Sequence, residues 1–160
     1  MKKVSIIMGS QSDLDVVNEA IQLLREFKIP FEARILSAHR TPKELVRHVE
    51  AAPKRGVGVF IAAAGMSAAL PGVIAAHTTL PVIGIPIESG SLKGLDALLS
   101  IAQMPPGIPV GCMSIGKSGA KNAAIFAVTI VAVSDRSLAK RLSDYRAKMR
   151  RKITQSKIKL

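Results

Sequence analysis

Short apolar segments alternate with segments of helical periodicity along the chain. Five apolar segments rich in Val, Ile, Leu or Ala are predicted to be β-strands: Val4–Met8, Phe31–Leu36, Val57–Ala63, Val82–Ile87 and Ile108–Ile115. Their apolar residues are nearly continuous, which is typical of strands buried on both faces of a parallel sheet. The pattern therefore predicts a three-layer α/β fold, with a parallel sheet of about five strands between two layers of helices.

Two helix starts follow predicted strands directly. Thr41, followed by Pro42 and Glu44, predicts an N-cap hydroxyl with a capping box and proline at the first helical position. Ser12 predicts a weaker N-cap for a helix whose apolar positions recur from Leu14 onward at helical spacing.

Two further helices are expected near the C-terminus. The segment 121–133 is apolar almost all round, so we expect it to be buried, and a subunit interface is one place for it. The segment 135–152 is amphipathic, with Leu138, Leu142, Tyr145 and Met149 on one face. We expect a single domain over residues 1–152 that includes this helix, followed by a basic segment over residues 153–160.

Composition and charge narrow the class of protein. The 160 residues are 48% apolar and 21% charged, which excludes a disordered chain. Only 3% are aromatic, which argues against the stacking platforms of single-stranded nucleic-acid binders. Of the net charge of +12, residues 136–160 carry +9, from ten Lys and Arg against one Asp. A solvated helix face explains this better than nucleic-acid binding, although a basic nucleic-acid-binding module remains an alternative.

The cysteine content and the apolar runs bear on location. Cys112, the single cysteine, lies in an apolar run and is expected to be a buried, inert thiol. The first apolar stretch is too short for a signal peptide, and glycines and prolines interrupt the longest one. We expect a cytoplasmic protein without a membrane anchor.

The predicted fold indicates where a ligand would bind. In open α/β sheets, ligands bind beyond the carboxyl ends of the strands, where helix N-termini present free amides. The loops at this edge are predicted to be Gly9–Asp13, Ser37–Thr41, Ala64–Pro71, Glu88–Ser91 and Gly116–Asn122.

The first two of these loops carry the most informative side chains. Gly9–Asp13 combines a flexible turn with two hydroxyls and suits a phosphate, although an ordinary turn with Ser12 as N-cap explains it equally well. In the loop Ser37–Thr41, His39 is a candidate proton carrier and Arg40 a candidate clamp for a phosphate or carboxylate. For His48 and His77 we expect a structural or solvent-exposed role instead.

Residues Gly111–Ser118 match the P-loop pattern G-x-x-x-x-G-K-[ST]. In a true P-loop the strand ends before the first glycine, whereas here the apolar strand continues past Gly111, and no later strand supplies a magnesium-binding Asp. We therefore reject ATP binding. No His, Cys, Asp or Glu spacing typical of a metal site is found, so no metal is expected.

Read in order, the loops resemble the PurE-type enzymes of purine biosynthesis, which comprise N5-carboxyaminoimidazole ribonucleotide mutases and aminoimidazole ribonucleotide carboxylases. The similarity covers about residues 4–150. The matching stretches are Met8–Asp13, Ser37–Pro42, Leu70–Gly72, Gly94–Ile101 with Gln103–Pro105, Gly107–Val110 and Asn122–Ala124.

The resemblance implies a flavodoxin-like (Rossmann-like) domain that assembles as a homo-octamer and uses no ATP, metal or organic cofactor. It further implies a mutase that transfers a carboxylate within a small-molecule nucleotide, with His39 as general acid and base. The positions that match the substrate-binding loops are Gly9, Ser10, Ser12, Asp13, Ser37, Ala38, Arg40, Gly65 and Leu70. The small residues of 64–70 suit a water-poor pocket that retains CO2.

One position departs from the mutase pattern. Where that pattern usually reads Gly-Gly-Ala-Ala-His-Leu-Pro-Gly, this chain has Gly65-Met66-Ser67-Ala68-Ala69-Leu70-Pro71-Gly72, so Ala69 replaces a histidine. The carboxylase branch, which uses free CO2, tends to carry Lys after the motif His. Arg40 and Leu70–Gly72 therefore favour the mutase, with the carboxylase as the alternative.

Overall fold

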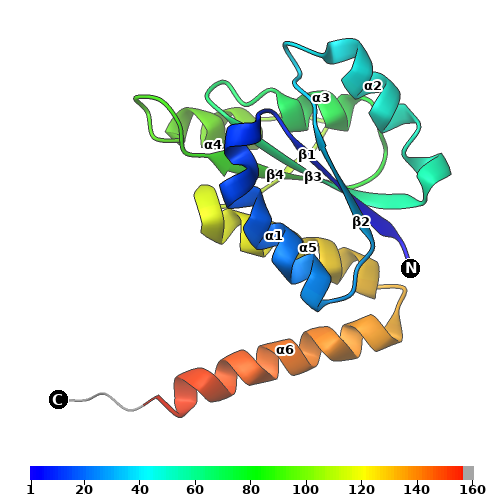
Figure 1. The fold of residues 1–160 in the computed structure, drawn as a ribbon, viewed down its shortest axis with the longest axis vertical. Coiled ribbons are helices and arrows are strands. Elements are labelled where there is room, and N and C mark those ends of the chain that lie inside the picture. Colours follow the sequence, from blue (N-terminus) through cyan, green and yellow to red (C-terminus); the bar gives the residue numbers. More distant parts are fainter. Residues whose placement is uncertain (157–160) are drawn as a thin grey trace.

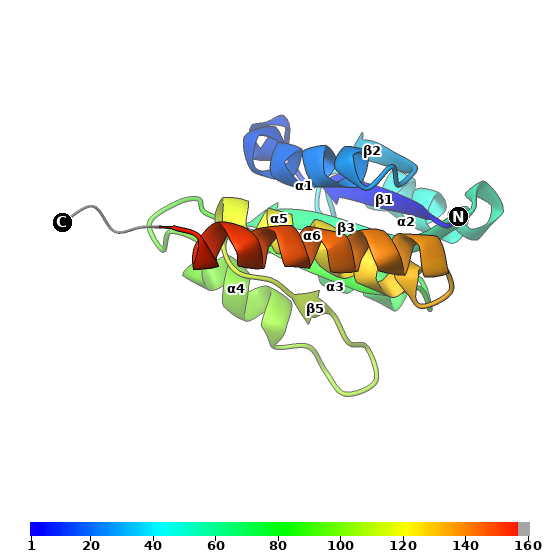
Figure 2. The ribbon, with the colours of Figure 1, turned by 90° about the horizontal axis from the view of Figure 1, so that it is seen from below.

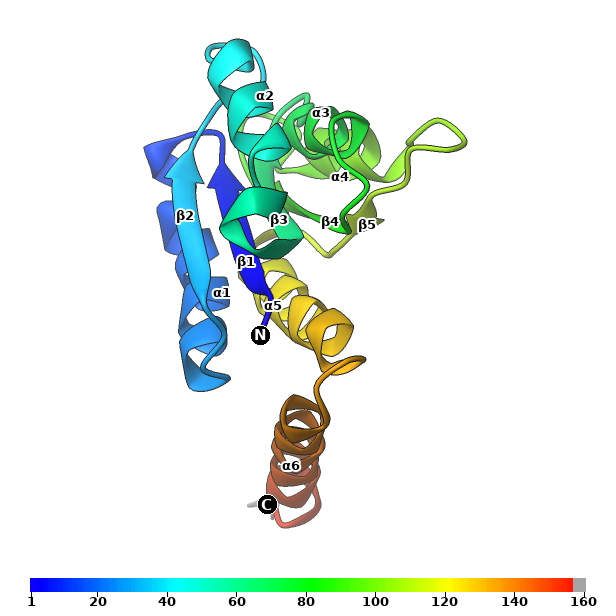
Figure 3. The same cartoon turned by 90° about the vertical axis from the view of Figure 1, so that its right-hand side faces the viewer.

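Five parallel strands form the central layer of the molecule. The computed structural model describes residues 1–156, and its strands lie in the order β2-β1-β3-β4-β5 (Figure 3). Their bounds are β1 (Lys3–Met8), β2 (Phe31–Ile35), β3 (Val57–Gly65), β4 (Val82–Ile87) and β5 (Gly111–Cys112). The parallel sheet of five strands is confirmed.

Helices cover both faces of the sheet (Figure 1). On one face lie α1 (Leu14–Glu26) and α5 (Gly116–Ala132), and on the other α2 (Pro42–Glu50), α3 (Leu70–Ala76) and α4 (Leu95–Ala102). Short 3-10 helices, η1 (Gln11–Asp13) and η2 (Pro53–Arg55), precede α1 and β3. Each face has its own apolar core, so the predicted flavodoxin-like three-layer fold is confirmed.

The two edge strands differ from the prediction. β2 is exposed along its second half rather than buried on both faces, because only β1 flanks it in the sheet. β5 has only two residues where Ile108–Ile115 was predicted. Pro109 has no N–H to donate to a neighbouring strand. Beyond the strand, only the N–H of Met113 still bonds the carbonyl of Gly84, at 2.9 Å.

Of the two predicted N-caps, Thr41 is confirmed in position but makes no capping bond with its side chain, and Ser12 is wrong. Thr41 occupies the N-cap position of α2, but its Oγ1 bonds the backbone of Ser37 rather than the first turn of the helix. The N-cap of α1 is Asp13 and not Ser12. Ser10 caps the preceding η1, where its hydroxyl accepts from the N–H of Ser12 while Asp13 accepts from the N–H of Ser10. In both loops the side chains stabilise the turn itself.

The C-terminal helices are less buried than the sequence suggests. Along α5 the alanines are buried, whereas Phe126 is 42% exposed, so this helix buries one face and not its whole circumference. The last helix, α6 (Arg136–Thr154), packs its first turns on α5 (Figure 2). Its Tyr145 ring contacts that of Phe27 in a tilted arrangement, with ring centroids 5.3 Å apart. Farther along, Met149 is half exposed.

The helix α6 continues beyond residue 152, the predicted end of the domain, and residues 157–160 of the predicted basic segment lie outside the described residues. Within residues 1–156, no helix combines the length and the apolar character needed to cross a membrane.

Candidate active site

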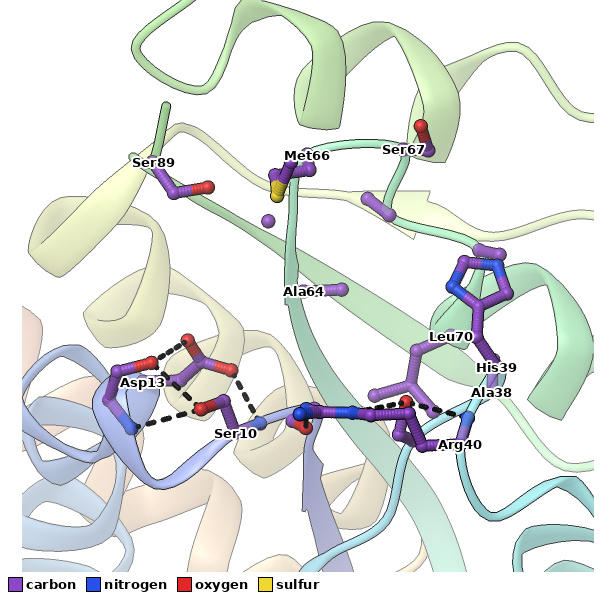
Figure 4. Close-up of a pocket in the computed structure, with 16 residues that line it drawn as sticks. Ser10, Asp13, Ala38, His39, Arg40, Ala64, Met66, Ser67, Leu70 and Ser89 are labelled. Carbon is purple, nitrogen blue, oxygen red and sulfur yellow. Dashed lines mark hydrogen bonds between the residues drawn. The ribbon is translucent and has the colours of Figure 1, made fainter. Parts of the chain in front are cut away.

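A pocket of about 500 Å³ opens at the carboxyl ends of the strands (Figure 4). The loops that follow β1, β2, β3 and β4 line it. All ten residues predicted for the site lie in its wall: Gly9, Ser10, Ser12, Asp13, Ser37, Ala38, His39, Arg40, Gly65 and Leu70. The fold thus brings together residues that are up to 61 positions apart in the sequence.

The loop after β1 is held rigid by its own side chains. Asp13 Oδ2 accepts a hydrogen bond from the backbone N–H of Ser10 at 3.0 Å, and the Ser12 hydroxyl donates to that of Ser10 at 2.9 Å. Burial raises the pKa of the Asp13 carboxyl, against the opposing effects of its hydrogen bonds with Ser10 and Ser12, of Gly9 and of the Arg40 charge. The loop therefore presents a preformed polar surface, with a carboxyl that protonates more readily than an exposed one.

Arg40 joins the loops that follow β2 and β1. Its Nη2 donates to the carbonyl oxygen of Gly9 at 2.8 Å, and its Nε lies 3.5 Å from the Ser37 hydroxyl. A guanidinium has five N–H donors, so most of them stay available to an anion in the pocket. Arg40 is exposed, and its fork is fixed in place before any ligand arrives.

His39 lies on the opposite side of the pocket from Ser10 and Asp13 (Figure 4). It is exposed and belongs to the turn between β2 and α2. An exposed imidazole in the wall of a pocket is open to a bound substrate, as a group that transfers protons must be.

The loop between β3 and α3 forms the remaining wall and contains the departure from the family pattern. Ala64 in β3, Ala68 in the loop and Leu70 at the start of α3 are buried, and Ala69 also lines the pocket, so no imidazole enters from that position. Met66 is 62% exposed and has φ +55°, in the left-handed region that disfavours residues other than glycine.

Sequence reasoning missed Ser89. It follows β4 and lines the pocket, in a loop that the strand-edge rule had selected without pointing to any one residue. The loop after β5 contributes no lining residue to this pocket. Lys117, in the first turn of α5, instead forms an ion pair with Asp15 at 2.9 Å on the surface. Gly111 lies within β5, so the P-loop-like pattern does not begin where a strand ends.

The other candidate residues lie outside the pocket. Cys112 is partly buried, and burial raises the pKa of its thiol. His48 lies in a polar cluster between β1, β2 and α2, where its Nε2 is 3.3 Å from Glu32 Oε1. Among residues 1–156, no three His, Cys, Asp or Glu side chains come together in a way that could hold a metal ion.

Comparison with known proteins gives a consistent result. Residues 3–152 match the model of the family described as AIR carboxylase. The N5-carboxyaminoimidazole ribonucleotide mutase of Pyrococcus abyssi is 51% identical over 94% of this chain and 86% of its own length. The mutase of Saccharolobus solfataricus is 46% identical over 99% of both chains, and that of Escherichia coli is 47% identical over 90% of this chain and 85% of its own.

The fold comparison agrees with the sequence comparison. The crystal structure of Treponema denticola PurE superposes with a TM-score of 0.86 and covers 97% of this chain and 96% of that one, at 29% sequence identity.

Proposed function

Because the chain belongs to the AIR carboxylase family, we propose that it is an N5-carboxyaminoimidazole ribonucleotide mutase of de novo purine biosynthesis. Such an enzyme moves a carboxylate from the exocyclic nitrogen of the substrate to ring carbon C4 and forms 4-carboxy-5-aminoimidazole ribonucleotide. The observation that carries this proposal is the identity of 46–51% with mutases over 94–99% of the chain. These relatives favour the mutase over the alternative, a carboxylase that uses free CO2.

His39 is the general acid and base of the proposed reaction. As the bond between the exocyclic nitrogen and the carboxylate carbon breaks, CO2 leaves and protonated His39 gives its proton to the nitrogen. Ring carbon C4 then attacks CO2, and neutral His39 takes the proton that C4 loses. The imidazole returns to its starting state, so no external acid, base or redox partner is consumed.

The nucleotide is held by the loops that follow β1 and β2. The free donors of Arg40 and the hydroxyls of Ser10 and Ser12 suit the phosphate, and the Asp13 carboxyl suits the hydroxyl groups of the ribose. Because hydrogen bonds within the protein already hold the Asp13 and Arg40 side chains in place, little ordering is needed on binding.

The loop between β3 and α3 supplies the apolar wall beside the reacting ring. The buried side chains of Ala64, Ala68 and Leu70 offer water no hydrogen-bond partner, which suits a pocket that retains the released CO2. Ala69 leaves His39 as the single imidazole among the pocket-lining residues, so one group carries both proton transfers.

An assay with two substrates tests this proposal. We expect the purified chain to convert N5-carboxyaminoimidazole ribonucleotide at low bicarbonate and in EDTA, because no metal or cofactor is required. His39→Asn should abolish turnover and leave nucleotide binding largely intact. His77→Asn is the matched control, because His77 contacts Glu50 outside the pocket. Product only from aminoimidazole ribonucleotide at high bicarbonate would assign the carboxylase activity instead.

Assembly and location are part of the same proposal. A cytoplasmic homo-octamer agrees with the exposed apolar side chains of Leu92, Leu95, Leu99 and Phe126, which are 42–60% exposed in the single chain. Size-exclusion chromatography with light scattering measures the molar mass of the assembly directly. Nucleic-acid binding through the basic face of α6 is not expected, and a salt-dependent shift of a labelled RNA by the purified chain would contradict this.

A further inference from the structure

The hydroxyl of Thr41 bonds both backbone groups of Ser37. Its Oγ1 accepts a hydrogen bond from the Ser37 N–H at 2.8 Å and donates one to the Ser37 carbonyl oxygen at 3.2 Å. The backbone N–H of Thr41 donates to the same carbonyl oxygen at 2.9 Å. Three hydrogen bonds therefore join the two ends of the turn 37–41, which connects β2 to α2.

This use of the hydroxyl differs from the ordinary role of threonine at the start of a helix. A threonine at an N-cap usually accepts a hydrogen bond from an N–H in the first helical turn, which stabilises the helix. Thr41 occupies the N-cap position of α2, but its side chain makes no such bond. Its hydroxyl therefore stabilises the turn that precedes the helix instead of the helix itself.

The turn that Thr41 closes carries two residues of the site, and other contacts hold only one of them. The N–H of Arg40 donates to the Ser37 hydroxyl at 3.2 Å, and its Nη2 donates to the carbonyl oxygen of Gly9 at 2.8 Å. In Figure 4 no hydrogen bond joins the imidazole of His39 to another residue of the pocket. The place of the His39 ring therefore depends on the backbone of the turn.

We propose that Thr41 is a positioning residue that holds the turn so that the His39 imidazole reaches the reacting atoms of the substrate. This inference rests on the proposed function, from which it takes the substrate and the role of His39. Thr41 is not among the residues that line the pocket, so it acts through His39 and not through contact with the nucleotide. Proton transfer requires the two atoms to lie within hydrogen-bond reach, so a small displacement of the turn slows the reaction.

Loss of the hydroxyl should therefore lower kcat and leave KM nearly unchanged. Thr41→Val keeps the shape of the side chain and removes two of the three bonds that close the turn. The Arg40 guanidinium and the Asp13 carboxyl keep their bonds to the loop after β1, so the groups proposed to hold the nucleotide stay in place. We expect kcat to fall about 10–100-fold, the usual effect of misplacing a catalytic group by about 1 Å.

Two further variants separate positioning from a general effect on the fold. Thr41→Ser keeps the hydroxyl and should therefore keep a kcat close to that of wild type. Thr129→Val is the matched control, because the half-buried Thr129 donates to the Ile125 carbonyl oxygen at 2.9 Å within α5, outside the pocket. Losing one such bond should lower the melting temperature by about 2–4 °C and leave kcat unchanged.

The experiment measures kcat and KM of the full chain with N5-carboxyaminoimidazole ribonucleotide, well below the melting temperature of every variant. Melting curves with and without aminoimidazole ribonucleotide report nucleotide binding independently of turnover. A lowered kcat for Thr41→Val, with the KM and the ligand-induced melting shift of wild type and with activity kept in Thr41→Ser, would support the inference.

Three results would overturn it. These are a Thr41→Val with the kcat of wild type, a Thr41→Val that raises KM instead or fails to fold, and an inactive Thr41→Ser. A wild-type chain inactive on N5-carboxyaminoimidazole ribonucleotide, and on aminoimidazole ribonucleotide with bicarbonate, would overturn the proposed function instead.

Discussion

Replacing Arg55 tests whether the polar cluster beneath α2 stabilises the fold. The Arg55 guanidinium contacts the Glu32 carboxylate, with Nη2 3.0 Å from Oε1, and donates to the carbonyl oxygen of His48 at 3.0 Å. It thereby joins η2, β2 and α2, and α2 follows the loop that carries His39. Arg55→Ala would leave Glu32 with the Ser5 hydroxyl at 3.1 Å, His48 at 3.3 Å and Lys3 at 3.7 Å.

The size of the effect follows from how deeply the pair is buried. Breaking a fully buried pair costs about 3–5 kcal/mol, whereas an exposed pair contributes about 0–1 kcal/mol. The Glu32 and Arg55 side chains are 19% and 31% exposed, between these two cases. We therefore expect Arg55→Ala to lower the free energy of unfolding by about 2 kcal/mol, midway between those limits.

The pKa of Glu32 determines how the destabilisation by Arg55→Ala changes with pH. Burial raises the pKa of Glu32, but the bonds from Arg55 and Ser5 and the nearby charges outweigh it, so its folded pKa lies below the ordinary value of 4.5. A carboxyl with a lowered pKa stabilises the fold above its unfolded pKa, and this contribution is lost as the pH falls through the folded value. The difference in free energy of unfolding between wild type and Arg55→Ala should be largest at pH 7 and should shrink below pH 4.5.

Urea unfolding at fixed protein concentration measures this difference as a shift in midpoint at constant slope. Glu32→Gln and the double variant complete a cycle that isolates the coupling of the two side chains. Lys140→Ala is the control, because its partner Asp144 is 65% exposed and the pair contributes less than about 0.5 kcal/mol. An unchanged midpoint for Arg55→Ala, or a difference that persists into acid, would refute the reasoning.

Two further substitutions test the pocket loops. Met66→Gly should stabilise the protein by up to about 1 kcal/mol, because it removes a side chain from the left-handed φ of +55°, whereas Met66→Ala keeps the strain and should not; thermal melts of both variants decide this. Asp13→Asn should remove a pH effect: burial raises the folded pKa of Asp13, so wild type should gain stability relative to the variant as the pH falls from 7 toward 4. Melting temperatures of wild type and variant that change in parallel across this pH range would contradict the raised pKa. At pH 7 the substitution should also weaken nucleotide binding.

Apolar runs predict the central strands well and the edge strands poorly. Val82–Ile87 forms β4 with the predicted bounds. All six of its residues are buried between two helix layers, so each one is apolar and the run of apolar residues matches the strand. For β5, prolines and glycines in the preceding loop limit strand pairing, which hydrophobicity does not register. The choice of Ser10 over Ser12 as the cap of η1 depends on the turn that Asp13 closes, which residue type alone does not reveal.

The loops of the site could be selected from the sequence because the fold places them at one edge of the sheet. Their individual roles depend on contacts between distant residues. Ser89 stands out only through its packing against Gly65, 24 positions earlier. Met66 stands out only through its backbone angle. The cluster of Ser5, Glu32, His48 and Arg55 likewise spans 50 positions and has no motif.

The two ends of the sheet bear on how the protein behaves when concentrated. An open strand edge can recruit strands from other molecules and start aggregation, and charged side chains or very short strands prevent this. At one end, β2 carries Glu32 and Arg34 within its five residues, and at the other, β5 is only two residues long. Neither edge offers a long apolar template, so this chain should resist edge-to-edge fibril growth even while its apolar helix faces are uncovered during synthesis.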